Sequence, residues 1–357
     1  MPPFWLSFIR TVKKGFPLKD LCLKSLPSSC PLWDNKGAMK IRPWKRLVLL
    51  LPLFLSLTET PAQQDESDEE GQAPFRVEVD AVNILATIHY KDSRKFVTDL
   101  TKEDFEIYED GVRQDITNFA QQINLPLTIA LCMDTSSSVR LKLAFEKETA
   151  IDFLYAVMRP IDKALLVEFD TGVTLVHDFT SNPNNLVREI KLLRAGGGTS
   201  LYDAVYLVAE QKMLQEEGRK TVVILSDGAD LTSKHTFEEM LRMAYQSEIT
   251  VYAISTTRFG ADIDHEGDNA LRQLTESTGG RAFFPYSAEQ LASAFQEVDQ
   301  ELRSQYNLTY VPSNKNRDGS FRKIKVKVDQ EGVRLRHRQG YFAPDAASSA
   351  DKSKVGG

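Results

Sequence analysis

The sequence predicts an α/β fold in which a doubly wound, mostly parallel sheet is inserted between an N-terminal and a C-terminal β segment. Three observations support it. Between residues 126 and 305, apolar runs of strand length alternate with amphipathic stretches of helix length, which implies right-handed crossovers between parallel strands. Residues 75–123 and 306–343 instead carry short strands separated by turns. At 357 residues, with 42% hydrophobic and 26% charged side chains, the chain is long enough for two domains.

The first 74 residues precede these domains. Residues 39–62 join the basic stretch MKIRPWKR to the apolar run LVLLLPLFLSL and a small-residue cleavage site after Ala62, which predicts a signal peptide. The run is too short for a spanning helix, although an uncleaved anchor stays the alternative. We therefore expect an exported protein, periplasmic or secreted. Residues 1–38, which precede the signal peptide, are then expected to result from a misassigned start or to form a disordered extension. The acidic residues 63–74 are expected to form a disordered linker.

Charge and cysteine content exclude some classes of protein. Residues 1–62 hold ten Lys and Arg but three Asp and Glu, so cleavage makes the chain more acidic than its full-length formal charge of −6. Non-specific nucleic-acid binding is therefore not expected. Cys22 and Cys30 lie in the same stretch, which leaves Cys132 alone in the mature chain and excludes an intrachain disulfide. Because Cys132 lies in an apolar strand, we expect a buried thiol.

The two β segments predict one discontinuous sandwich. The N-terminal strands are FRVEVDA, NILATIHY, FEIYED and QDITNFA, and the C-terminal strands are YNLTYV, FRKIKVKV and VRLRHR. Segments of about 49 and 38 residues bury too little surface to be stable alone, so we expect them to share a core. Residues 344–357 predict a disordered tail.

The central region, 126–305, predicts the doubly wound domain element by element. Parallel strands are expected at 127–133, 164–169, 221–226, 249–255 and 281–285, with an antiparallel edge strand, VTLVHD, after the turn at 170–172. Helices are expected at 140–158, 183–194, 200–217, 236–246, 267–277 and 287–305. In the usual order of such sheets, the first strand lies beside strand 221–226, so the residues that follow both strands meet at one crevice.

Oxygen-bearing side chains gather at that crevice. They come from DTSSS after the first strand, GGGTS before a helix and SDG after strand 221–226, and they are Asp134, Ser136, Ser138, Thr199 and Asp227. The three glycines let Thr199 approach closely. Such a set suits Mg²⁺, or its relatives Mn²⁺ and Ca²⁺, which prefer oxygen ligands. The alternative is that these residues are turn and cap residues.

The set resembles the metal-ion-dependent adhesion site of the von Willebrand factor type A family, whose Asp-x-Ser-x-Ser, distant Thr and distant Asp are all present. The resemblance covers 126–305. It implies that Ser136, Ser138 and Thr199 bind the metal directly and that Asp134 and Asp227 bind it or orient its waters. It also implies that an Asp or Glu of a protein partner completes the coordination. Over 75–343 the chain is also similar to bacterial, acidobacterial-type secreted proteins with a related domain, whose role is largely unassigned.

Other polar residues can be interpreted either as structural or as functional. Strict alternation in KIKVKV and VRLRHR predicts that their basic side chains share one face of a sheet. This face could bind an anionic surface, or it could simply be solvated, with its lysines preventing edge pairing. Its residues are Lys323, Lys325, Lys327, Arg334, Arg336 and Arg338. Asp230 is either a holder of metal-bound water or a helix cap, and Asp203 favours a structural role at a helix start. A hydrolase would need a base such as His235 or His265, and the chain has no GxSxG motif.

The sequence therefore predicts an exported, non-enzymatic binding protein that engages an acidic group of a partner through a divalent cation. A structural or envelope-assembly module, in which the metal only stabilises loops, stays the alternative. A metal-assisted hydrolase is the least favoured.

Overall fold

The computed structural model describes residues 81–93, 95–121, 125–256 and 265–345, all within one compact unit. Several predicted segments lie outside the described residues: the start region 1–38, the signal peptide 39–62, the linker 63–74, most of strand FRVEVDA, and residues 346–357. Among the helices that are described, none combines the length and the apolar character needed to cross a bilayer.

A six-stranded sheet forms the centre of the α/β domain, in the order β10-β9-β8-β5-β6-β7. Its strands are β5 (Leu127–Asp134), β6 (Lys163–Phe169), β7 (Val173–Thr180), β8 (Arg219–Ser226), β9 (Thr250–Ser255) and β10 (Arg281–Phe283). All pairs are parallel except β6 with β7, as predicted for the antiparallel edge strand. Every residue of β5, β8 and β9 is buried, because helices cover both faces of a parallel sheet.

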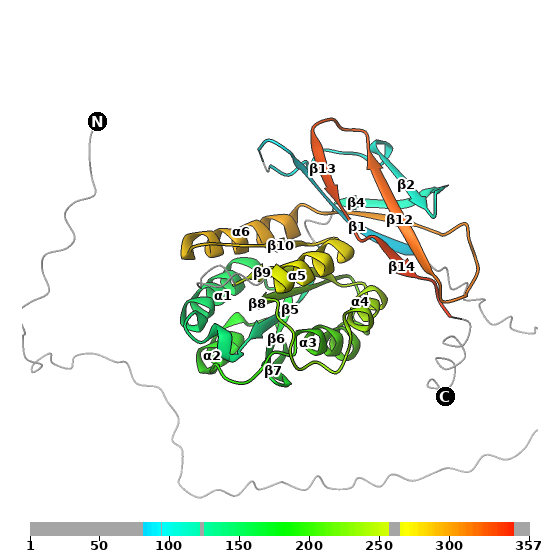
Figure 1. Cartoon of the computed structure of the whole chain (residues 1–357). Coiled ribbons are helices and arrows are strands. Elements are labelled where there is room, and N and C mark those ends of the chain that lie inside the picture. Colours follow the sequence, from blue (N-terminus) through cyan, green and yellow to red (C-terminus); the bar gives the residue numbers. More distant parts are fainter. Residues whose placement is uncertain (1–80, 94, 122–124, 257–264, 346–357) are drawn as a thin grey trace, which may run out of the picture. The chain divides into compact units, whose positions relative to one another are not determined.

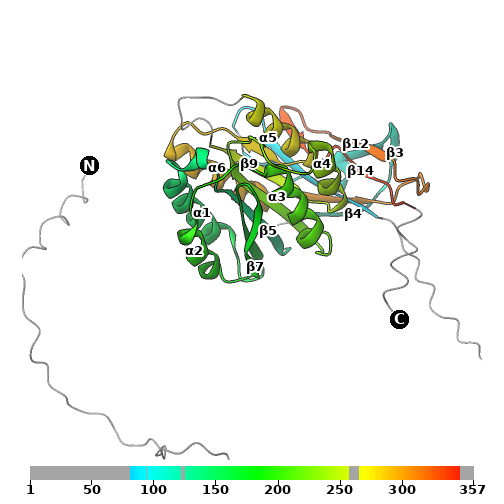
Figure 2. The ribbon, with the colours of Figure 1, turned by 60° about the horizontal axis from the view of Figure 1, so that its bottom comes forward.

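Helices cover both faces of this sheet (Figure 2). One apolar cluster joins the sheet to α1 (Leu143–Val157), α2 (Pro183–Leu192) and α6 (Ala288–Arg303). A second joins its other face to α3 (Leu201–Val208), α4 (Phe237–Gln246) and α5 (His265–Thr278). Helix α4 starts where expected because Thr236 and Glu239 form a capping box. The helix predicted at 200–217 is shorter: after Val208 it continues as a π segment, Ala209–Met213.

Strands from both ends of the described chain build the β-sandwich, and they lie together in Figure 1. The first sheet has the order β13-β1-β11-β4 and the second the order β14-β12-β2-β3. The N-terminal strands are β1 (Val82–Tyr90), β2 (Phe105–Glu109), β3 (Val112–Gln114) and β4 (Ile116–Gln121). The C-terminal strands are β11 (Tyr306–Tyr310), β12 (Phe321–Val328), β13 (Val333–Arg336) and β14 (Gly340–Phe342). Each sheet mixes the two segments and one apolar cluster fills the space between, so the predicted fold class is confirmed.

A buried polar cluster fastens the two halves of the sandwich. Glu109 of β2 is 2% exposed and accepts hydrogen bonds from the hydroxyls of Tyr310, at 2.7 Å, and Tyr341, at 2.9 Å. The guanidinium of Arg322, on β12, lies 3.3 Å from its other oxygen. All three partners come from the C-terminal segment, so a single N-terminal carboxylate satisfies donors from three C-terminal positions.

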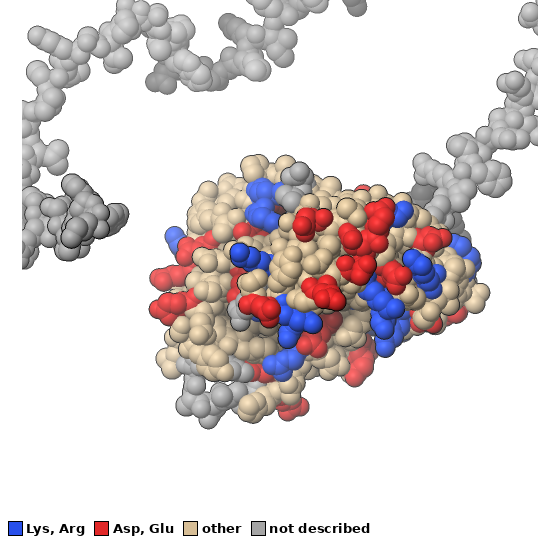
Figure 3. Space-filling view, turned by 90° about the horizontal axis from the view of Figure 1, so that it is seen from above, with Lys and Arg blue, Asp and Glu red and all other residues tan. Residues whose placement is uncertain are grey.

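The predicted cationic face is not one surface, because β12 and β13 belong to different sheets. Lys323, Lys325 and Lys327 are exposed on β12. On the face of the molecule that Figure 3 shows, basic side chains are interspersed with acidic ones. Two of the three arginines instead pair with acidic residues of the α/β domain: Arg336 with buried Glu301 of α6, and Arg338, only 8% exposed, with Glu248. Sequence alternation alone missed this, since it does not reveal which sheet a strand joins.

Candidate metal centre

Asp134, the last residue of β5, is fixed in the crevice by two hydrogen bonds. Its Oδ1 accepts from the Ser136 backbone N–H at 2.8 Å, and its Oδ2 accepts from the Ser226 hydroxyl at 2.6 Å. Ser226 ends the neighbouring parallel strand β8, directly before Asp227. The predicted meeting of the two strand ends is therefore present, and the side chain that joins them, Ser226, was missed in the sequence.

The serine loop and the glycine-rich loop are also held together. The hydroxyls of Ser136 and Ser138 lie 2.9 Å apart. Backbone bonds from Gly196 N–H to the Thr135 carbonyl (2.7 Å) and from Ser137 N–H to the Gly197 carbonyl (3.2 Å) join this loop to the loop that carries Thr199. Gly197 has a φ of +81°, and a Cβ there would lie 2.7 Å from the Thr171 hydroxyl. Glycine is thus required for this approach, as predicted.

The loop after β8 completes the arrangement. The backbone N–H groups of Leu231 and Thr232 both donate to the Thr199 carbonyl, at 2.9 and 3.0 Å. Gly228 has a φ of +82°, and a Cβ would lie 2.4 Å from the Gly267 carbonyl oxygen at the start of α5, so a larger residue would push the loop away. The structure thus brings together the three loops that carry Asp134, Ser136, Ser138, Thr199 and Asp227. Four of these residues are buried and Ser138 is exposed.

An acidic residue that sequence reasoning missed lies close enough to interact electrostatically with Asp134 and Asp227. Glu146, on α1, is 1% exposed, and among the described residues neither carboxylate oxygen has a partner in good hydrogen-bond geometry, although the Thr256 hydroxyl is near enough to lower the Glu146 pKa somewhat. Burial, followed by the negative charge of Asp134, raises the pKa of Glu146 to about 8, against the opposing charge of Lys142. The available signal was position, since Glu146 occupies the inward stripe of α1 that otherwise holds Leu143, Ala150 and Phe153.

The surroundings of Asp134 disfavour its charged form. Burial raises its pKa to about 6, hydrogen bonds from Ser136 and Ser226 oppose the rise, and the charge of Asp227 adds to it. A divalent cation would supply the missing positive charge to Asp134, Asp227 and the buried carboxylate of Glu146. The donor set fits a hard cation, because it consists of oxygens.

Across the described residues, no three His, Cys, Asp or Glu side chains converge as a metal-binding group. Ligation would consequently depend on the serine and threonine hydroxyls beside the aspartates. Metal binding by these five residues stays a prediction.

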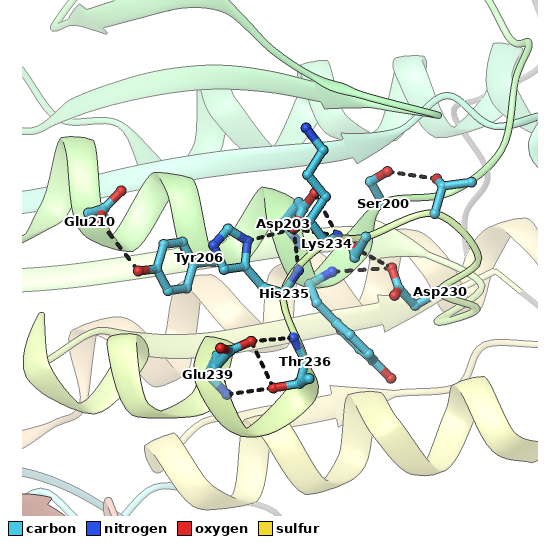
Figure 4. A network of polar contacts seen from close by, with 12 residues as sticks. Ser200, Asp203, Tyr206, Glu210, Asp230, Lys234, His235, Thr236 and Glu239 are labelled. Atoms are coloured by element: carbon cyan, nitrogen blue, oxygen red, sulfur yellow. Dashed lines mark hydrogen bonds and ion pairs between the residues drawn. The ribbon is translucent and has the colours of Figure 1, made fainter.

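Asp230 and Asp203 brace the neighbouring loop (Figure 4). Asp230 accepts hydrogen bonds from the Ser233 hydroxyl, at 2.7 Å, and from the Tyr202 backbone N–H, at 3.4 Å. Asp203 accepts from the backbone N–H groups of Lys234 and His235, so it holds the loop as well as starting a helix. These bonds fix the segment whose backbone binds the Thr199 carbonyl.

The histidine that a hydrolase would need is engaged elsewhere. His235 lies 2.6 Å from Asp203 through Nδ1, and its ring stacks on Tyr206 with centroids 3.7 Å apart (Figure 4). His265 is the first residue of α5. Within the part of the chain that the structure describes, no hydrogen bond joins either ring to Ser136 or Ser138, so no Ser–His pair is formed there.

Comparison with known proteins gives one sequence match and several similar structures. Residues 129–229 match the family model of the von Willebrand factor type A domain. Among curated proteins, none matches this chain. The chain is similar to a von Willebrand factor type A protein from Catenulispora acidiphila, at 11% identity and a TM-score of 0.44, over 77% of this chain and 76% of that one.

Two further similar structures come from a pilin and a byssus protein. A variant of the PilB minor pilin from Streptococcus sanguinis has 14% identity and a TM-score of 0.41, over 51% of this chain and 62% of that chain. Proximal thread matrix protein 1 from the mussel byssus, with a zinc-occupied MIDAS motif, has 17% identity and a TM-score of 0.45, over 56% of this chain and 50% of that chain. This chain therefore spans less than two thirds of the length of both proteins.

The matched sequence begins within β5 and ends just after Asp227, and it includes the three loops that the fold brings together. This chain thus carries a von Willebrand factor type A domain, and residues 129–229 of that domain hold all five side chains of the candidate metal centre.

Proposed function

We propose that this protein is an exported, non-enzymatic binding protein. Its type A domain holds a divalent cation, Mg²⁺ in the first instance, at Asp134, Ser136, Ser138, Thr199 and Asp227. Through this cation it engages an Asp or Glu side chain of a protein partner. The observation that carries the proposal is the mutual hydrogen bonding of three loops from distant parts of the sequence, which gathers oxygen donors around buried, uncompensated carboxylates.

The hydrogen bonds of Asp134 support a role in which this carboxylate does not neutralise the charge of the cation. Both of its oxygens already accept hydrogen bonds, from Ser136 and Ser226, so its charge acts on the cation chiefly through space or through water. The hydroxyls of Ser136, Ser138 and Thr199 are neutral ligands. A cation held mainly by neutral oxygens keeps a net positive charge, and that charge attracts an external carboxylate.

Metal titration by calorimetry tests the site, with a matched control in the same loop. Ser136→Ala and Ser138→Ala should weaken Mg²⁺ or Mn²⁺ binding at least about tenfold, since each removes one ligand. Ser137→Ala should leave binding unchanged, because its side chain is exposed between the two ligands. Equal affinities for all three variants would reject the site.

Carboxylate recognition is tested separately with an immobilised Asp-containing peptide and its Asn analogue. The Asp peptide should bind only with the metal present, and Asp134→Ala should abolish binding while far-UV circular dichroism stays native. If EDTA or Asp134→Ala instead unfolds the domain, the metal stabilises loops, and the structural alternative is correct. If metal binds but the Asp and Asn peptides behave alike, carboxylate recognition is rejected.

Export is tested independently by mass spectrometry of the protein recovered from the cell envelope and the medium. We expect a mature N-terminus directly after Ala62. An intact chain retained in the cytoplasm would contradict export without affecting the metal site.

A further inference from the structure

A cleft of about 970 Å³ lies between the sandwich and the α/β domain. Its α/β wall comes from the end of α5 and from β10, and its sandwich wall from β1, β12 and β13. Because β10 contributes its amino end, the cleft lies at the opposite edge of the parallel sheet from the loops of the metal centre, which follow the carboxyl ends of β5 and β8. It is therefore a separate site.

The lining is strongly basic for a chain of net negative charge. Its described residues include one carboxylate, Glu276, and six cationic side chains: Lys91, Arg272, Arg281, Lys323, Arg334 and Arg336. Two of the six are neutralised by ion pairs, Arg281 with Glu297 and Arg336 with Glu301.

The other four cations have no ion pair within the described residues and are exposed. They are Lys91, Arg272, Lys323 and Arg334. One of them, Arg272, is oriented by a 3.0 Å bond to Asn269 and by the ring of Phe284. Four uncompensated cations therefore face a single Glu276. Such a concentration of like charge favours an anionic ligand that bridges the two walls.

The walls are fixed relative to each other by direct contacts. The backbone N–H of Gln339 donates to the Ser277 carbonyl at 2.9 Å, and Arg338 pairs with Glu248 at 3.1 Å. A Cβ at Gly279 would lie 2.6 Å from the Arg338 backbone nitrogen, so the two domains pack closely there. The spacing of the cations is consequently set by the fold.

The cleft also presents the free edge of a sheet. Among the described strands, β10 (Arg281–Phe283) pairs with β9 alone, and its residues Arg281 and Ala282 line the cleft. The N–H of Gly280, directly before the strand, already donates to the Thr275 carbonyl at 2.9 Å, so the free edge begins at Arg281. On the opposite wall, β13 is likewise the edge strand of its sheet. Unpaired backbone groups at an edge form hydrogen bonds with an extended peptide. Among the described lining residues none is Phe, Tyr or Trp, which favours a peptide over a nucleic acid as the anionic ligand.

We propose that this cleft binds an extended acidic peptide segment of a partner protein, which adds to the β10 edge and places carboxylates against Lys91, Arg272, Lys323 and Arg334. Alternate residues of a strand point to the same side about 6.8 Å apart, so every second side chain faces the cations. Guanidinium groups bind carboxylates through two parallel hydrogen bonds, which favours the arginines as anchors.

Fluorescence anisotropy tests the proposal with a labelled octapeptide of alternating Glu and Val, in EDTA so that the metal centre takes no part. The peptide should bind at about 50 mM salt and weaken as salt rises, whereas the Gln analogue should not bind. The double variant Lys91→Gln, Arg334→Gln should bind about tenfold more weakly. The matched double variant Lys325→Gln, Lys327→Gln, on the exposed face of β12, should bind as the wild type does.

Three outcomes would overturn the proposal. The Gln peptide could bind equally well, or both double variants could lose affinity alike. A sulfated oligosaccharide could also displace the peptide at lower concentration than unlabelled peptide does, which would make the cleft a glycan site. The edge-strand geometry is tested by N-methylating alternate amides of the peptide, which should abolish binding. Asp134→Ala should leave peptide binding in EDTA intact, so this proposal and the metal-dependent function can fail independently.

Discussion

Replacing Glu109 by Gln should specifically destabilise the sandwich. One oxygen of Glu109 accepts from Tyr310 and Tyr341, and the other faces Arg322, which is 2% exposed. An amide oxygen can still accept from the tyrosines, but the amide nitrogen cannot neutralise the arginine. Breaking one side of a buried ion pair costs about 3–5 kcal/mol, and Arg322 keeps two backbone acceptors, at Asn314 and Asn316. We therefore expect a loss near the lower limit, about 3 kcal/mol.

Native-state hydrogen exchange, read by mass spectrometry on peptides of β2 and β11, measures this loss in the sandwich separately from the α/β domain. The control is Glu106→Gln on the same strand, where the side chain is 39% exposed and its pair with Arg113 is at the surface. The control should cost about 0.5 kcal/mol or less. Equal protection in the two variants would refute the view that Glu109 fastens the halves of the sandwich.

Three further predictions concern single buried groups. The pKa of Glu146 is raised in the folded state from 4.5 to about 8, so its contribution to metal-free stability is fully present below pH 4.5 and is lost as pH rises to about 8. Thermal unfolding in EDTA should show this fall in stability, and Glu146→Gln should remove the part above about pH 6, because Asp134, with a pKa of about 6, contributes a fall of its own at lower pH. Arg336→Met should lower the free energy of unfolding by denaturant by about 3 kcal/mol, because it leaves Glu301, at 0% exposure, without its cation. Arg334→Met, at an exposed position of the same strand, should lower it little. Similar losses in the two variants would contradict the pairing of Arg336 with Glu301. Burial raises the pKa of Cys132 to about 12, so a thiol reagent at neutral pH should label it only after unfolding, and rapid labelling of the native protein would show that it is not buried.

Periodicity predicted the α/β domain well because its strands are buried on both faces and its helices start at strong caps such as Thr236 with Glu239. The pairing of β5 with β8 followed from a general rule for strand order, and it brought Asp134 near Asp227 as expected. Ser226 was missed because a serine at the end of a strand has no sequence pattern that sets it apart from the adjacent Asp227. Glu146 was missed because a single charge within an apolar stripe is easily taken for the polar face of the helix.

The sandwich was harder to predict in detail. Turn residues marked its strands, but alternation does not say which strands share a sheet, so β12 and β13 were wrongly placed together on one cationic face. The destination of Arg336 and Arg338 depends on how the sandwich packs against α6 and the loop after α4, and those are long-range contacts with no local pattern.

The pairing of β1 with β11, which joins Val82 to Tyr310, also constrains the order of assembly during synthesis. When the ribosome has just translated β1, the partner strand β11 still lies more than two hundred codons ahead. The inserted domain, in contrast, contains its entire core within one continuous stretch. Domains fold largely as they emerge, so the inserted domain can be complete while β1 to β4 still wait for their partners. A released chain that ends just before β11 would hold the complete central domain and unpaired N-terminal strands, which are open to chaperones or to pairing with a neighbouring copy.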